Sequence, residues 1–220
     1  MKGLSDTSAG PSAVNKPVEL TETGFESTKD GRQLLKYLVS CALPEGTSVY
    51  THFKGKRYNF HGELGLAPQW LHDGMDTTSQ RWVSGCILAR TNYFGQHIRI
   101  SMRADTHVSD ALDTVPEEIR DYPLYEGGFF GNIFSENPVA YTCLGERSEK
   151  DNANPILGWR ICTKDSGETL PTGEKLSMCD FIITGACSDP KNLTVGGESY
   201  KEVIKVYLKP GLSSLCKDHC

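Results

Sequence analysis

Residues 79–95 read SQRWVSGCILARTNYFG and predict a helix at the centre of this protein. At its start, Thr77 and Gln80 have the spacing of a capping box, which marks a helix N-terminus. The residues that follow recur on one broad helical face: Trp82, Val83, Cys86, Ile87 and Arg90. We therefore expect Cys86 in the middle of this helix, on its buried side.

Cys86 has one feature of a catalytic thiol. Gln80 precedes it by six residues, the spacing at which papain-like proteases place a Gln that supplies an oxyanion donor. The signature around the papain nucleophile is absent, however, and no His with a following Asn lies at the expected distance downstream. The surroundings of Cys86 favour a structural half-cystine.

The cysteine content indicates an oxidising compartment. The chain has 8 cysteines among 220 residues, an even number and a high one for a reduced protein. We expect four disulfides and no free thiol, formed by Cys41, Cys86, Cys143, Cys162, Cys179, Cys187, Cys216 and Cys220.

Two disulfide pairings follow from the predicted elements. Cys41 lies in the last turn of another predicted helix, and a bridge to Cys86 would stabilise the fold by roughly 3–4 kcal/mol on the chain-entropy model. Cys143 and Cys162 flank a polar loop and are the expected partners across a hairpin. The four remaining cysteines contain no CxxC pair, which favours disulfides over a zinc site.

Charge and hydropathy limit the classes of binding partner and the cellular compartments that suit this chain. The net charge is −5, and no basic cluster exceeds KGKR at 54–57, which disfavours nucleic acid. No apolar run approaches the roughly 18–20 residues of a transmembrane segment. With the export signal removed, the chain is expected to be extracytoplasmic: secreted, periplasmic or lipid-anchored. Residues 1–24 are too polar to order and are expected to form a disordered leader or tether, followed by a single compact domain over 25–220.

Periodicity predicts an α+β fold, with two or three helices packed on a mainly antiparallel sheet and stabilised by disulfides. A helix capped by Asp30 ends before Pro44, and a short helix begins at Pro116. Residues 48–61 alternate as a β-hairpin. Further strands are expected at 97–102, 128–134, 139–143, 159–163, 181–184 and 200–209.

The hairpin carries the weak metal candidates. If Phe53 pairs with Tyr58, then His52 and His61 lie diagonally across two strands, about 7–8 Å apart. They lack a third ligand at a fixed spacing, so surface residues are the favoured interpretation, and no metal or other cofactor is expected.

The sequence contains no standard catalytic motif: no GxSxG, Walker loop or HExxH. A secreted hydrolase would have to use carboxylates or histidines on loops, in a cleft between helices and sheet. The weak catalytic candidates are Glu63, His72, Asp73 and Asp76, with Glu117 and Glu118 as further loop carboxylates.

Four segments carry a family resemblance: LKYLVSCALPEG, ELGLAPQW, RWVSGCILARTNYFG and YEGGFFGNIF. Over about residues 33–145 the chain resembles an uncharacterised family of exported proteins, often lipoproteins, from myxobacteria and their relatives. The resemblance implies an extracytoplasmic, disulfide-bearing bacterial protein, and it brings no activity with it.

Two classes of function stay open, so the sequence leaves undecided whether the protein is an enzyme. In the first, a cell-envelope or secreted module binds a protein or glycan of the cell surface through exposed aromatic residues: Tyr93, Phe129, Phe130 and Tyr141. In the second, the protein is a secreted hydrolase, and a thiol oxidoreductase is a remoter alternative. The oligomeric state is also open.

Overall fold

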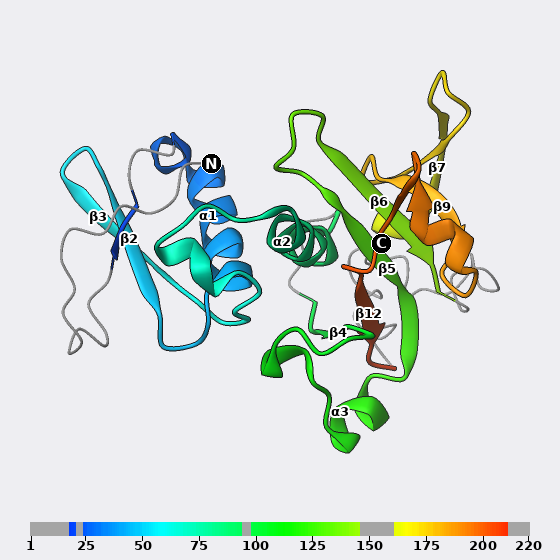
Figure 1. Ribbon diagram of the computed structural model, residues 1–220, viewed down its shortest axis with the longest axis horizontal. Helices are drawn as coiled ribbons and strands as arrows, with labels where there is room; N and C mark the ends of the chain where they lie inside the picture. The colour runs from blue at the N-terminus through cyan, green and yellow to red at the C-terminus, as the bar shows by residue number, and fades with distance from the viewer. Residues whose placement is uncertain (1–17, 21–23, 94–97, 146–160, 211–220) are drawn as a thin grey trace, which may run out of the picture. The chain divides into compact units, whose positions relative to one another are not determined.

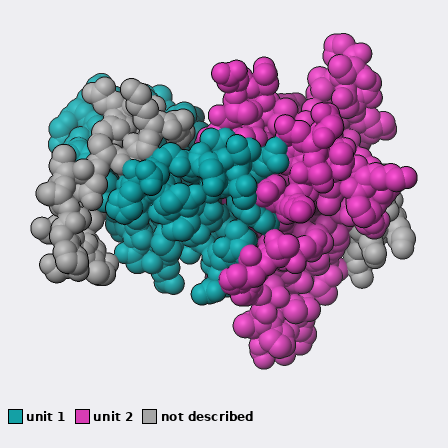
Figure 2. Space-filling model, viewed as in Figure 1, with its two compact units in different colours: residues 1–83, 108–111 teal, residues 84–107, 112–220 magenta. Residues whose placement is uncertain are grey.

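The computed structural model describes residues 18–20, 24–93, 98–145 and 161–210. The chain forms two compact units, residues 1–83 with 108–111 (unit 1) and residues 84–107 with 112–220 (unit 2), coloured separately in Figure 2. The boundary falls within helix α2 (Thr77–Ala89). The expectation of a single compact domain over 25–220 stays a prediction.

Unit 1 combines helix α1 (Lys29–Ala42) with a three-stranded sheet (Figure 1). The sheet has the order β1 (Val18–Glu19), β2 (Ser48–Phe53), β3 (Lys56–His61). Leu35 and Val39 of α1 are fully buried, as is Val49 of β2. The N-cap of α1 is Thr28, whose side chain accepts a hydrogen bond from the Gly31 amide, so the expected cap at Asp30 is wrong by two residues.

Strand β1 shortens the expected leader. Val18 and Glu19 pair in parallel with β2, and the Leu20 amide donates to the Tyr50 carbonyl at 2.7 Å. Leu20 itself is buried. The leader boundary at residue 24 therefore does not hold for 18–20, and residues 1–17 and 21–23 lie outside the described part of the chain.

The segment that follows the hairpin caps the C-terminus of α1 with backbone hydrogen bonds. The last carbonyls of a helix have no partner within it. Here the backbone amides of Leu64, Leu66 and Ala67 donate to the carbonyls of Ser40, Cys41 and Ala42, over 2.8–3.1 Å. The segment ELGLA at 63–67 is therefore held against the end of α1 by backbone hydrogen bonds.

The β2–β3 hairpin turns through two residues, Lys54 and Gly55, both with positive φ (50° and 76°). Such turns fit the right-handed twist of the strands. Phe53 therefore pairs with Lys56, two residues from the expected Tyr58. Because a shift of two residues preserves the faces of a strand, the predicted inner and outer faces are nevertheless confirmed.

Unit 2 is built on a seven-stranded sheet with the order β4-β12-β5-β6-β9-β8-β7. Only the β6–β9 pair is parallel, and the other pairs are antiparallel. This confirms the α+β class. The strands are β4 (Ile100–Arg103), β5 (Leu124–Asn132), β6 (Val139–Leu144), β7 (Asp165–Thr169), β8 (Lys175–Ser177), β9 (Ile182–Ala186) and β12 (Ile204–Leu208), with a separate two-stranded sheet of β10 (Thr194–Val195) and β11 (Glu198–Ser199).

The two faces of this sheet are covered differently. On one face, Gly85 of α2 approaches so closely that a Cβ there would lie 2.9 Å from the Phe129 carbonyl oxygen. On the other, Phe130, Tyr141 and Tyr200 pack as a buried aromatic cluster. Helix α3 (Pro116–Asp121) begins at the predicted proline.

One predicted strand is wrong. Ile161–Thr163 forms a short 3-10 turn rather than the end of a strand at 159–163, and residues 159–160 lie outside the described part. Strands β7 and β8 lie in polar sequence, DSGET and KLS, whose composition gives no strand signal. Their pairing with neighbouring strands decides their conformation.

Candidate functional site

The cysteines are structural in the part of the chain that the structure describes. Cys143 bonds to Cys187 and Cys162 to Cys179, so the expected Cys143–Cys162 bridge is wrong. The physical reason is the parallel β6–β9 pair: the Cys187 amide donates to the Leu144 carbonyl at 2.8 Å, which brings Cys187 to the end of β6.

Cys41 and Cys86 are also disulfide-bonded. Both side chains are completely buried. Cys86 is therefore no free nucleophile, as its sequence context indicated. The Cys41–Cys86 pairing stays a prediction, and Cys216 and Cys220 lie outside the described residues.

The weak catalytic candidates have structural roles or stand on the surface. Asp76 caps α2, since its Oδ1 accepts from the Ser79 amide at 2.7 Å, and this hydrogen bond lowers the pKa of the Asp76 carboxyl. Glu63 Oε2 accepts from the Ser40 hydroxyl at 2.5 Å. His72 and Asp73 are exposed. Among the described residues, no three of these four side chains lie close enough together to bind one metal ion.

The register of the hairpin separates the two metal candidates. His61 pairs with Ser48 and His52 with Arg57, four residues apart along the strands, or about 13 Å. His61 Nδ1 lies 2.8 Å from Ser48 Oγ, and His52 Nδ1 lies 2.9 Å from Glu19 Oε1. Both histidines are exposed, which agrees with the surface interpretation.

The expected aromatic binding surface is wrong. Phe129 and Phe130 are completely buried and Tyr141 is buried, whereas Tyr93 is 53% exposed. Strand β5 has neighbours on both sides and packing on both faces, so its aromatic residues form the core. The glycines beside them admit this packing: a Cβ at Gly128 would lie 2.8 Å from Cys143 Sγ.

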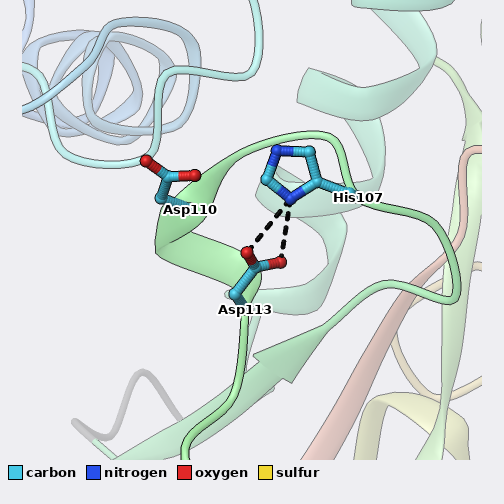
Figure 3. Close-up of side chains that lie close together, drawn as sticks. All are labelled: His107, Asp110 and Asp113. Carbon is cyan, nitrogen blue, oxygen red and sulfur yellow. Dashed lines mark hydrogen bonds and ion pairs between the residues drawn. The ribbon is translucent and has the colours of Figure 1, made fainter.

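A group of possible metal ligands that sequence reasoning missed occurs at His107, Asp110 and Asp113 (Figure 3). Their ligand atoms lie within 4.8 Å of one another, and His107 Nδ1 contacts both carboxylate oxygens of Asp113 at 3.0 and 3.1 Å. All three are exposed. Calcium takes six to eight oxygen ligands and structural zinc takes four, so three surface groups supply less than either site requires.

No helix in the described ranges is both long and apolar enough to cross a membrane. Comparison with models of known protein families, with curated proteins and with solved structures finds no match to this chain.

Proposed function

We propose that this protein is an extracytoplasmic, disulfide-stabilised module, secreted or held in a bacterial cell envelope, that binds a protein or glycan of the cell surface. The observation that carries the proposal is the state of its cysteines: six described cysteines are disulfide-bonded, and none of the described cysteines is free.

The positions of the disulfides support an oxidising compartment. Cys143 and Cys162 are completely buried, and each is bonded to a half-buried partner. Native disulfides of small domains typically contribute about 2–5 kcal/mol, which a reducing compartment would withdraw. The interior of unit 2 is thus built around bonds that suit an exported protein.

The arrangement of the polar groups favours binding over hydrolysis. Hydrolytic chemistry with two carboxylates needs both groups at a defined distance across one site. Of the candidates, Asp76 is engaged at a helix N-terminus and Glu63 with Ser40, while His72 and Asp73 lie on the surface. The hydrolase alternative therefore has no particular observation in its favour.

The test combines cell fractionation with thiol counting. An antibody against the protein should detect it in the envelope or culture-medium fraction of the cells that produce it. Alkylation of the denatured, unreduced protein, followed by mass spectrometry, should label none of the eight cysteines. A cytoplasmic protein with free thiols at Cys143 or Cys162 would overturn the proposal.

A further inference from the structure

The hairpin of unit 1 concentrates positive charge in an acidic protein. Residues 46–62 contain Lys54, Lys56 and Arg57 and no Asp or Glu, although the whole chain has a net charge of −5. Lys54, Lys56 and Arg57 are exposed. Arg32, from the first turns of α1, joins them beside the ring of Tyr58. We call Arg32, Lys54, Lys56 and Arg57, with the rings they contact, the basic–aromatic hairpin.

Each of these cations lies over an aromatic ring. The Arg57 guanidinium is 3.8 Å from the ring centroid of Tyr50, and Lys54 Nζ is 5.4 Å from that of Phe53. Lys56 Nζ and the Arg32 guanidinium lie 5.2 and 4.8 Å from the centroid of Tyr58. Cation–π contacts of this kind contribute about 0.5–1 kcal/mol at exposed sites. They restrict the long side chains without neutralising their charge.

No carboxylate of the described residues forms an ion pair with any of the four cations, since every ion pair found there involves other basic groups. The carboxylate nearest in the sheet, Glu19, is engaged by His52 at 2.9 Å and by the Tyr50 hydroxyl at 3.3 Å. Arg32 also donates to the Glu26 carbonyl at 2.7 Å, and the charge of Arg57 contributes to lowering the pKa of Glu19. Within the described part of the chain, Lys54, Lys56 and Arg57 therefore form an exposed positive group without a direct ion pair, which is complementary to an anionic partner.

The distribution of the charges favours a polymer over a single anion. In the antiparallel register, Arg57 lies on the outer face with Tyr50, whereas Lys56 lies on the opposite face with Phe53 and Tyr58. One small anion cannot contact cations on both faces of a two-stranded hairpin. A flexible chain with repeated acidic groups can pass around the turn at Lys54–Gly55 and contact them in succession.

The rings favour a polysaccharide over a membrane. Phe53 and Tyr58 are half-buried, and their faces are occupied by the cations. They are therefore not free to enter a lipid interface, where exposed aromatic side chains anchor proteins. What the hairpin presents is charge held at fixed points, which suits carboxylates or sulfates repeated along a sugar chain.

We propose that the basic–aromatic hairpin binds an acidic polysaccharide of the cell surface. This inference rests on the proposed extracytoplasmic binding function and names the class of its partner. Recognition is electrostatic, so the affinity should fall as the salt concentration rises.

The test measures binding of the full-length, disulfide-bonded protein to polygalacturonate by calorimetry at low ionic strength. Neutral dextran and phosphatidylglycerol vesicles are the comparison ligands. We expect binding to polygalacturonate alone. The triple variant Lys54→Gln/Lys56→Gln/Arg57→Gln should bind about tenfold more weakly or worse. The milder Lys54→Gln/Lys56→Gln variant changes only exposed side chains and keeps the Arg57–Tyr50 contact, so it tests the same loss with less risk to folding.

A matched control removes the same charge from unit 2. Lys164, Lys191 and Lys201 are exposed, and their joint replacement by Gln should change the affinity by less than about twofold. Equal losses in both triple variants would show attraction to net charge and overturn the assignment to the hairpin. Binding to vesicles instead of polygalacturonate would replace the polysaccharide with a membrane. Absence of binding to either, in a protein that fractionates outside the cytoplasm without free thiols, would refute this inference and leave the proposed function standing.

Discussion

Each unit contains an arginine stacked on a tyrosine at the same distance. In unit 1 the Arg57 guanidinium lies 3.8 Å from the centroid of Tyr50, and in unit 2 the Arg103 guanidinium lies 3.8 Å from that of Tyr207. The partners of the remaining N–H groups differ. Arg57 is exposed and donates to the Asn59 side chain, whereas Arg103 is half-buried and donates to the Tyr122 carbonyl at 2.8 Å.

The difference shows that Arg103 is a structural cation, whereas Arg57 is available to a ligand. Arg103 also donates to Ser101 Oγ at 2.9 Å, and through the Tyr122 carbonyl it binds the C-terminal end of α3, where a cation is favoured by the helix dipole. Its donors are used inside unit 2. Arg57 has donors left for a ligand. A cation–π pair by itself therefore does not mark a binding site. Whether the arginine is available to a ligand depends on how many of its other N–H groups already donate within the protein.

The largest effect on stability is expected from the disulfides of unit 2, the unit that contains Arg103. Cys143→Ser/Cys187→Ser should lower the free energy of unfolding by about 2–5 kcal/mol. The Cys143–Cys187 bond spans 44 residues and the Cys162–Cys179 bond spans 17, so removing the first should cost about 0.8 kcal/mol more on loop entropy. Urea unfolding of this variant and of Cys162→Ser/Cys179→Ser measures the difference. A larger loss of stability in the second variant would contradict the entropic account.

The second prediction compares the two arginines directly. Arg103→Met keeps an apolar stem but leaves the Tyr122 carbonyl without its donor, so it should lower the free energy of unfolding by about 2 kcal/mol. Arg57→Met should change it by less than about 0.5 kcal/mol, because the side chain is exposed. Urea unfolding with matched baselines tests both. Equal losses would remove the distinction between the structural and the available pair.

The third prediction concerns Tyr125, which stacks on Tyr207 with ring centroids 4.8 Å apart. Its hydroxyl is buried and has no hydrogen-bond partner among the residues that the structure describes. Burial raises the pKa of Tyr125 above its usual 10.0. The unfolded chain therefore releases this proton near pH 10 while the folded chain keeps it, so stability is full below pH 10 and falls as the pH rises beyond it.

Tyr125→Phe removes both the buried hydroxyl and its titration. Near pH 7 the variant should be as stable as the parent or more stable by up to about 1 kcal/mol. Above pH 10 its advantage should grow. Thermal unfolding followed by circular dichroism across this range is the measurement, and parallel pH profiles for the two proteins would be the contrary result.

The smallest effect is expected beside the Arg57–Tyr50 pair. The hydrogen bond with His52 lowers the pKa of Glu19 below its usual 4.5. The resulting stabilisation of β1 is present above pH 4.5 and is lost as the pH falls through the folded-state pKa. In Glu19→Gln, hydrogen exchange of the Leu20 amide, which bonds to Tyr50, should be faster than in the parent near pH 6, and the two should converge at acidic pH. A constant ratio across the pH range would exclude this role.

Local signals sufficed for several elements. The helical face around Cys86, the apolar run of α1, Pro116 at the start of α3 and the alternating hairpin were predicted from sequence, because short-range periodicity and capping determine such elements. Errors of two residues arose at the α1 cap and the hairpin turn. There, Thr28 and the Lys54–Gly55 turn gave better local geometry than Asp30 and a longer loop.

The candidate site residues could not be placed in this way. Phe129 and Phe130 look like exposed aromatics beside glycines, but their strand is covered on both faces. Asp76 and Glu63 look like free acids, but one caps a helix and the other accepts from Ser40. The basic–aromatic hairpin was visible only as the short run KGKR, because the contribution of Arg32 comes from a distant helix.

By itself, then, the sequence determined the α+β class, the predicted helices, the two faces of the hairpin and the structural nature of Cys86, all of which depend on residues close together in the chain or on composition. Tertiary structure alone decided the order of the seven-stranded sheet, the parallel β6–β9 pair and hence the bonding of Cys143 to Cys187 rather than Cys162. The physical reason is that strand pairing and disulfide formation join residues tens of positions apart, and their energies depend on packing that no local pattern encodes.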